Sequence, residues 1–233
     1  MSSPTSRAST TPTDAIQHLA ISARTKSTTV TPSRPRQHRN QSTPQSEITT
    51  AAQTKTLPDF DTTANPLITA QTLALLASGT FISASEPVVL LGDSGTGKSH
   101  LLIGTCIAAA ENGHRVRYVT CAQLANELAE AADDLHLSKT VARYGRFDLL
   151  AIDELGYVHL DQRAAELLFQ ILTEREERAS LGVASYSPFS EWGRTFTDTR
   201  LAAAVIDRIT YRAHIIETGT ASYRLATTSM TTK

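Results

Sequence analysis

The sequence predicts an α/β fold in which a five-stranded parallel sheet is flanked by helices. Residues 92–99 fit the pattern G-x-x-x-x-G-K-[ST] at every fixed position, and they lie between an apolar run and a helix-like run. Strand-like and helix-like segments then alternate as far as residue 216, which is typical of the β-α units that build a parallel sheet. An apolar run that ends in Asp153 and Glu154 is the third observation.

Each expected element has its own signal in the sequence. The first strand, residues 87–91, is a continuous apolar run, as expected for a strand buried on both faces of a sheet. Phe60 lies in a turn-like segment before it and is expected to anchor the core, with covering of a nucleotide base as the alternative. Further strands are expected at 115–120, 147–152, 181–185 and 213–216, and helices at 68–76, 99–112, 122–132 and 162–178.

The phosphate loop itself consists of Gly92, Asp93, Ser94, Gly95, Thr96, Gly97, Lys98 and Ser99. Its glycines let backbone N–H groups approach a phosphate chain where a Cβ would block them. Lys98 is expected to contact the β- and γ-phosphates, and the Ser99 hydroxyl is expected to hold Mg²⁺. A Gly/Ser turn that merely contains a lysine is the alternative, but strand, loop and helix follow in the required order. The motif therefore predicts nucleotide binding.

The acidic pair Asp153 and Glu154 follows Lys98 by 55 residues and ends an apolar run. Such a pair emerges at the carboxyl edge of the sheet, where α/β folds place their ligands. Asp153 is then expected to hold Mg²⁺ through water, and Glu154 to take a proton from the water that attacks the γ-phosphate. A strand that simply exits into a charged loop is the alternative. The order of the motifs favours ATP hydrolysis with ATP and Mg²⁺ as ligands.

Composition indicates an ordinary globular protein with a basic N-terminal arm. Of 233 residues, 40% are hydrophobic, and no apolar stretch approaches the length of a membrane span. Without a hydrophobic leader near the N-terminus, a cytoplasmic protein is expected. Cys106 and Cys121 lack metal-ligand spacing and are expected to be core thiols.

Charge and composition divide the chain into three parts. Residues 1–58 carry a net charge of +5, and the remainder carries −6. Residues 1–55 are expected to be a disordered basic arm rich in Ser and Thr, residues 56–228 the ATPase domain and residues 229–233 a tail. The arm either attracts nucleic-acid phosphates or is a solvated tail without a dedicated partner.

The segment from Lys55 to Leu225 resembles the IstB-like helpers of insertion-sequence transposition, which are similar to DnaC-type helicase loaders of the AAA+ class of P-loop NTPases. The phosphate loop is shared by many ATPases, whereas other segments are more particular. These are residues 55–61 (KTLPDFD), 153–157 (DELGY), 188–192 (PFSEW), the helix at 203–208 with Ile206, Asp207 and Arg208, and residues 222–225 (SYRL).

The resemblance implies an ATPase that assembles on double-stranded DNA as a homo-oligomer, bends the DNA and brings a partner transposase to it. DNA binding is expected to be largely independent of sequence, because no helix-turn-helix or zinc-finger pattern stands out. Arg208 matches an arginine that enters a neighbouring subunit's site, with a surface ion pair as the alternative. The expected nucleotide-binding set also includes His100 and Arg224. Arg224 matches a second arginine that senses the nucleotide, with a structural or solvated residue in a terminal strand as the alternative. Positions 194, 200 and 212 could contact DNA phosphates or form a solvated face.

Two departures from the family keep other functions open. Family members have Thr-Ser-Asn after the fourth strand, where this chain has Ala184, Ser185 and Tyr186, and a tyrosine cannot replace the amide that orients water. Ser185 compensates in part, or hydrolysis is slow. The arm also lacks the family's charged helical module. The alternatives are a helicase loader and a non-hydrolysing, nucleotide-gated binding module; a small-molecule kinase would need an arginine-rich lid, and residues 155–165 offer only Arg163.

Overall fold

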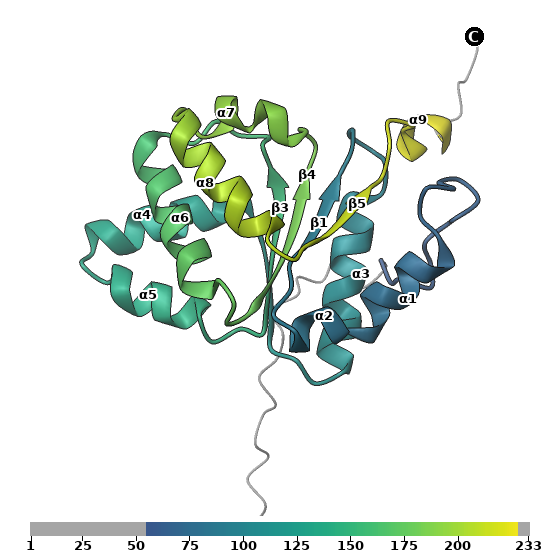
Figure 1. Cartoon of the computed structure of the whole chain (residues 1–233), viewed down its shortest axis with the longest axis horizontal. Helices are drawn as coiled ribbons and strands as arrows, with labels where there is room; N and C mark the ends of the chain where they lie inside the picture. The colour runs from purple at the N-terminus through teal and green to yellow at the C-terminus, as the bar shows by residue number, and fades with distance from the viewer. Residues whose placement is uncertain (1–54, 228–233) are drawn as a thin grey trace, which may run out of the picture. The chain divides into compact units, whose positions relative to one another are not determined.

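The structure, a computed structural model, describes residues 55–227, so the predicted arm lies almost entirely outside the described residues. Its centre is a parallel sheet with the strand order β2-β3-β4-β1-β5 (Figure 1). The strands are β1 (Val88–Leu91), β2 (Val116–Thr120), β3 (Leu149–Leu155), β4 (Ser180–Ser185) and β5 (His214–Glu217). The predicted fold class, a five-stranded parallel sheet flanked by helices, is confirmed.

Helices pack on both faces of this sheet (Figure 1). The described helices are α1 (Ala70–Ser78), α2 (Thr80–Ser83), α3 (Lys98–Glu111), α4 (Cys121–Asp133), α5 (Leu137–Tyr144), α6 (Gln162–Arg175), α7 (Trp192–Thr195), α8 (Thr199–Thr210) and α9 (Tyr223–Thr227), with a short 3-10 helix, η2 (Phe189–Glu191), before α7. In the described part of the chain, no helix is long and apolar enough to cross a membrane.

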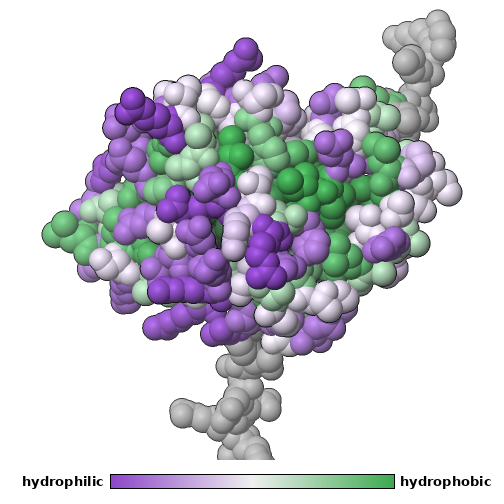
Figure 2. Space-filling model, in the orientation of Figure 1, coloured by the Kyte–Doolittle hydropathy of each residue, from purple (hydrophilic) through white to green (hydrophobic). Residues whose placement is uncertain are grey.

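The continuous apolar runs of the central strands supply two cores. Successive side chains of a strand point to opposite faces. Val88 and Leu90 therefore pack with α1, α2 and α3, whereas Val89 and Leu91 pack with α4, α6 and α8. All four residues of β1 and all six of β4 are buried, since these strands lie inside the sheet and are covered on both sides. Figure 2 shows apolar side chains at the surface near the edge strand β5, and Ile215 of this strand is exposed.

Strand register brings the chemical motifs to one edge of the sheet. Leu91, the last residue of β1, is paired with Ser185, the last residue of β4. Asp153 lies near the end of β3 and is paired with Thr120, the last residue of β2. The residues that follow β1, β3 and β4 therefore emerge at the same carboxyl edge.

Three local predictions need correction. Residues 223–227 form the helix α9, so Arg224 is not in a terminal strand. α4 begins at Cys121, one residue before the predicted start at 122, because Thr120 caps that helix and forms a capping box with Gln123. α5 has no counterpart among the predicted helices. Cys106 and Cys121 are both buried, as expected for core thiols.

Candidate nucleotide site

The phosphate loop joins the end of β1 to the start of α3. Gly97 has φ +100°, and a Cβ there would lie 2.7 Å from Cε2 of Phe60, so this position requires glycine. The first helical bond runs from the Leu101 N–H to the Gly97 carbonyl, at 2.9 Å. The N–H groups of Lys98 and Ser99 consequently have no intrahelical acceptor, and the positive end of the helix dipole faces the loop. This is the backbone arrangement of an anion-binding site.

Lys98 is folded into the loop that precedes it. Its Nζ donates to the carbonyls of Gly92 and Asp93, at 2.7 Å each. Burial lowers the pKa of this ammonium, while the carboxylates of Asp153 and Asp93 act in the opposite direction. Because an ammonium has three N–H donors and the two carbonyls take two of them, Lys98 keeps a donor for an anion in the loop.

The adjacent acidic residues Asp153 and Glu154 have opposite environments. The Asp153 side chain is buried, and its oxygens accept hydrogen bonds from the Tyr118 hydroxyl at 2.7 Å and from the Glu154 N–H at 2.8 Å. Glu154 has φ +60°, and the pairing of β3 with β4 shifts register between Ile152 and Leu155. This irregularity turns the Glu154 side chain out to solvent. The pair thus divides into a fixed, buried carboxylate and an exposed one.

Residues 56–69, the leading segment, hold the phosphate loop from one side. Asn65 donates from Nδ2 to the carbonyls of Thr96 and Thr218, at 3.1 and 3.0 Å. His100 contacts the carbonyl of Thr56 through Nε2 at 2.8 Å and packs edge-on against Phe60. His100, predicted to bind nucleotide, therefore contacts the leading segment in this structure.

Residues 218–223, the trailing segment, hold the loop from the other side. The Asp93 N–H donates to the Gly219 carbonyl at 2.9 Å, and the Tyr223 N–H donates to the Gly95 carbonyl at 3.0 Å. Arg224 follows Tyr223 in α9 and therefore lies at the same end of the molecule as the phosphate loop. The loop is thus fixed by segments far apart in the sequence.

The position expected to hold a water-orienting amide carries an exposed ring. Tyr186 follows β4, is 41% exposed and packs edge-on against Tyr157, with ring centroids 5.9 Å apart. Ser185 is buried, and its hydroxyl donates to the Ser187 carbonyl at 2.9 Å. Neither residue presents an amide to the loop.

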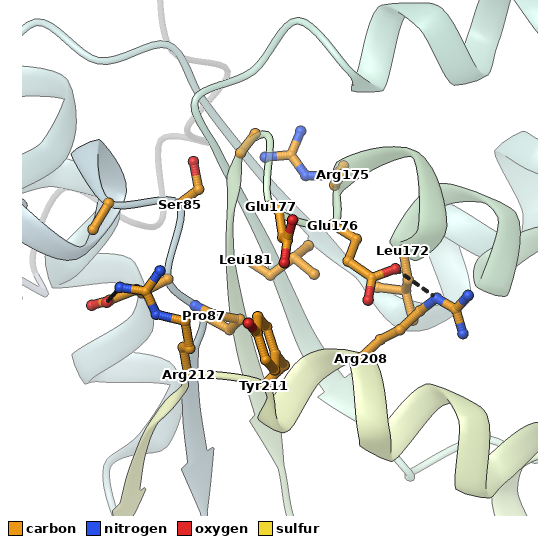
Figure 3. Close-up of a pocket in the computed structure, with 13 residues that line it drawn as sticks. Ser85, Pro87, Leu172, Arg175, Glu176, Glu177, Leu181, Arg208, Tyr211 and Arg212 are labelled. Carbon is orange, nitrogen blue, oxygen red and sulfur yellow. Dashed lines mark hydrogen bonds and ion pairs between the residues drawn. The ribbon is translucent and has the colours of Figure 1, made fainter.

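Arg208 lies at the other edge of the sheet. It lines a cavity of about 280 Å³ with residues that immediately precede β1 and β4, such as Pro87 and Ala179 (Figure 3). Its guanidinium forms an ion pair with Glu176, at 3.2 Å, and lies over the Phe169 ring. The six residues of β4 separate the two edges by roughly 20 Å at about 3.3 Å per residue. The structure therefore gathers Lys98 and the acidic pair but not Arg208.

The protein side chains available to a metal ion are few. Ser99 and Asp153 both lie at the carboxyl edge, and the described residues contain no group of three or more His, Cys, Asp or Glu that could hold a metal. Mg²⁺ typically uses one or two protein ligands together with substrate phosphates and water, so this donor set fits Mg²⁺ bound with a nucleotide.

Sequence comparison assigns the family. Residues 27–231 match the family described as IstB-like ATP binding protein. The chain belongs to this family. Over 171 residues, which is 73% of the chain, it is 36% identical to a putative insertion sequence ATP-binding protein of Sinorhizobium fredii and 35% identical to the insertion sequence IS21 putative ATP-binding protein of Pseudomonas aeruginosa. The matched part spans 57% and 64% of those two proteins.

Solved structures place this IstB-like chain in the AAA+ fold. It superposes on DnaI with a TM-score of 0.60 at 20% identity, covering 73% of this chain and 94% of that one. The DnaC helicase loader gives a TM-score of 0.58 at 19% identity, covering 72% and 99%. The replication initiator DnaA bound to AMPPCP and single-stranded DNA gives 0.58 at 20% identity, covering 70% and 49%. At these identities the likeness concerns the fold.

Proposed function

We propose that this IstB-like protein binds ATP with Mg²⁺, hydrolyses it with stimulation by DNA, and regulates a partner transposase in insertion-sequence transposition. One observation carries the nucleotide part of the proposal: Lys98 and the open N-terminus of α3 lie at the same carboxyl edge of the sheet as the buried Asp153. The names of the curated relatives, which are ATP-binding proteins of insertion sequences, support the biological setting.

The binding role is divided among residues of the loop and β3. The N–H groups at the start of α3 would bind phosphate oxygens, and Lys98 would add a charge-assisted hydrogen bond. Ser99 and Asp153 would hold the Mg²⁺, which supplies charge neutralisation on the phosphates. Arg224 would add positive charge near Lys98. Binding then needs little rearrangement of the backbone, because the leading and trailing segments already fix the loop.

Hydrolysis would depend on the exposed carboxylate of Glu154 at the same edge of the sheet. Glu154 would take a proton from the attacking water, and its outward side chain is free to approach that water. Tyr186 offers no amide to orient the water, so we expect slow turnover. The same observation favours a second candidate function, a nucleotide-gated module that assembles on DNA or a partner without turnover.

Arg208 supports assembly of a homo-oligomer. Since it lies at the edge opposite to its own phosphate loop, it would act on the nucleotide of a neighbouring copy, where a guanidinium stabilises charge on the transferred phosphoryl group. Reaching that nucleotide would require Arg208 to exchange Glu176 for the phosphate.

DNA contacts are proposed for exposed arginines and for the basic arm. Arg194 and Arg200 are exposed, whereas Arg212 forms an ion pair with Glu86 at 2.8 Å. The arm is outside the described residues. A helicase-loader role is the remaining alternative, and a shared fold with DnaC does not separate the two roles.

Deletion of residues 1–54 should weaken DNA binding and reduce its dependence on salt, because fewer basic side chains would contact phosphates. An unchanged salt slope would exclude a contact between the arm and DNA.

ATP hydrolysis by the purified full chain, with and without duplex DNA, tests the enzymatic proposal. We expect wild-type turnover to rise with DNA and to exceed that of Glu154→Gln by about 100-fold or more, because a positioned general base contributes on that scale. Glu154→Gln should still bind ATP. Equal turnover of the two proteins would exclude the ATPase and leave the nucleotide-gated module.

Mixing two inactive variants tests the shared site. Lys98→Ala and Arg208→Ala proteins should recover part of the activity when combined. A complete site forms wherever the loop of an Arg208→Ala subunit, with its intact Lys98, faces the intact Arg208 of a Lys98→Ala subunit. A mixture of Lys98→Ala with Glu154→Gln is the control, since both defects fall in the same half of the site and no interface becomes complete. Absence of recovery in the first mixture at every ratio would remove Arg208 from the site.

A further inference from the structure

Tyr118 fixes one oxygen of the carboxylate that the proposed function assigns to Mg²⁺. The Tyr118 hydroxyl donates to Oδ2 of Asp153 at 2.7 Å, and the Glu154 N–H donates to Oδ1 at 2.8 Å. With a donor on each oxygen, the plane of the carboxyl group has one preferred orientation. The sequence motifs at this edge include Asp153 and Glu154 but give no role to Tyr118.

Strand pairing explains how the tyrosine reaches the aspartate. In the parallel register of β2 with β3, Tyr118 is paired with Ala151, and Thr120 is paired with Asp153. Residues two apart on neighbouring strands share a face and lie within reach of a long side chain. The Tyr118 ring packs in the core between the sheet and α3, so the hydroxyl has little freedom to move away from Asp153. Two rigid strands therefore set this contact.

A second tyrosine in the chain shows what a purely structural arrangement looks like. The Tyr144 hydroxyl donates to Oε2 of Glu127, also at 2.7 Å. Arg117 and Arg143 form ion pairs with the same Glu127 carboxylate, at 2.9 and 2.8 Å. Glu127 is thus neutralised by cations. The two donors described above for Asp153 are a neutral hydroxyl and a backbone N–H, which hold the carboxylate while preserving its negative charge.

Preserved charge and fixed orientation are what a metal-binding carboxylate requires. Burial of a charged group costs free energy unless hydrogen bonds compensate, and Asp153 is only 3% exposed. An arginine partner would compensate too, but it would compete with a cation for the carboxylate. A tyrosine hydroxyl compensates without that competition. Metal-binding carboxylates are commonly oriented by such hydrogen-bonding partners, whose loss weakens metal binding.

We propose that Tyr118 is a positioning residue for the metal site: its hydroxyl orients the Asp153 carboxylate so that Mg²⁺ binds with the nucleotide. This inference rests on the proposed function. It assigns Tyr118 no contact with ATP or with the reacting phosphate, and it places the effect of Tyr118 wholly in the Mg²⁺-dependent part of nucleotide binding.

The test is a titration of Mg²⁺ against binding of a fluorescent ATP analogue by full-length Tyr118→Phe, which loses only the hydroxyl. We expect the Mg²⁺ concentration at half-saturation to rise about tenfold, as is usual when a partner of a metal ligand is removed. Analogue binding in EDTA should equal that of the wild type. Tyr144→Phe, which loses the matched hydroxyl on Glu127, should leave the Mg²⁺ titration unchanged.

A double variant shows whether the effect passes through Asp153. Adding Tyr118→Phe to Asp153→Asn should shift the Mg²⁺ titration no further than Asp153→Asn alone. An unchanged titration in Tyr118→Phe would overturn the inference. So would an equal shift in Tyr144→Phe, a full additional shift in the double variant, or loss of analogue binding in EDTA. If Asp153→Asn itself leaves the wild-type titration unaltered, the metal role of Asp153 in the proposed function fails instead.

Discussion

The two edges of the sheet use charged residues in different ways. At the amino edge, two arginines are paired with carboxylates: Arg115 forms an ion pair with Asp148 at 2.6 Å, and Arg208 pairs with Glu176. At the carboxyl edge, Lys98 bonds to backbone carbonyls, and Asp153 accepts from a hydroxyl and an N–H. The first arrangement compensates each charge locally, whereas the second fixes the charges in place and leaves them available.

This difference teaches where to expect losses of stability and where to expect losses of ligand binding. Substitutions at the amino edge remove a contact that exists in the folded chain alone, so they should lower the free energy of unfolding. Substitutions at the carboxyl edge remove a group whose proposed main partner is a ligand, so they should lower binding or turnover with a smaller effect on folding. The predictions below test that division.

Arg175 should give the largest loss of stability. This buried guanidinium donates to the carbonyls of Tyr144 and Ser180, at 2.6 and 2.7 Å. Arg175→Leu would remove the buried charged donor of both carbonyls and lower the free energy of unfolding by about 3 kcal/mol in urea denaturation. Arg178→Leu, which removes an exposed arginine paired with Glu174, is the control and should cost less than about 0.5 kcal/mol. Nucleotide affinity of the folded Arg175→Leu protein should be unchanged; a large loss of affinity would break the comparison.

Tyr186 should limit turnover at the carboxyl edge. Tyr186→Asn would introduce an amide at the carboxyl edge, directly after β4, and we expect ATP hydrolysis to rise about tenfold or more, since one well-placed polar group contributes at least that much. Tyr186→Phe keeps the ring that packs on Tyr157 and should leave hydrolysis unchanged. If Tyr186→Asn hydrolyses ATP no faster than the wild type, the ring does not limit turnover.

Asp148 should give the smallest effect, and that effect should depend on pH. The Arg115 side chain and N–H hold the pKa of Asp148 below its usual value. A lowered folded-state pKa contributes stability above the unfolded pKa of about 3.9, and this contribution is lost as pH falls through the folded pKa. Asp148→Asn should therefore cost up to about 1 kcal/mol at pH near 7, since the pair is partly exposed, and nothing at sufficiently low pH. Urea denaturation at both pH values checks this; a cost independent of pH would show that the ion pair is not its cause.

The fold was largely predictable because its signals are local. Continuous apolar runs identify β1 and β4, and the loop motif marks the junction with α3. Where local signals conflict with tertiary contacts, the predictions are wrong. Arg224 was expected in a terminal strand, but the Tyr223 N–H donates to the Gly95 carbonyl and α9 begins at Tyr223. β5 also begins and ends one residue later than predicted, at His214 and Glu217.

The candidate site was predictable in its motifs but not in its supporting contacts. Lys98 and the acidic pair lie in recognisable patterns, and strand order brings them together. The contact between Tyr118 and Asp153 depends on the register of β2 with β3, which no local pattern encodes. Asn65 likewise bonds to Thr218 across 153 positions of the sequence. The left-handed backbone of Glu154 follows from a register shift between strands, which is also a tertiary property.

The melting temperature of Lys98→Ala, with and without ATP and Mg²⁺, tests the central claim most directly. Ligand that binds the folded state at about 100 times its Kd stabilises it by about 2.7 kcal/mol, so wild-type protein should melt several degrees higher with ATP. Lys98→Ala should lose this shift while melting close to the wild type without nucleotide; Lys139→Ala, an exposed lysine on α5, should keep the shift. A Lys98→Ala protein that is stabilised by ATP as strongly as the wild type would contradict the account.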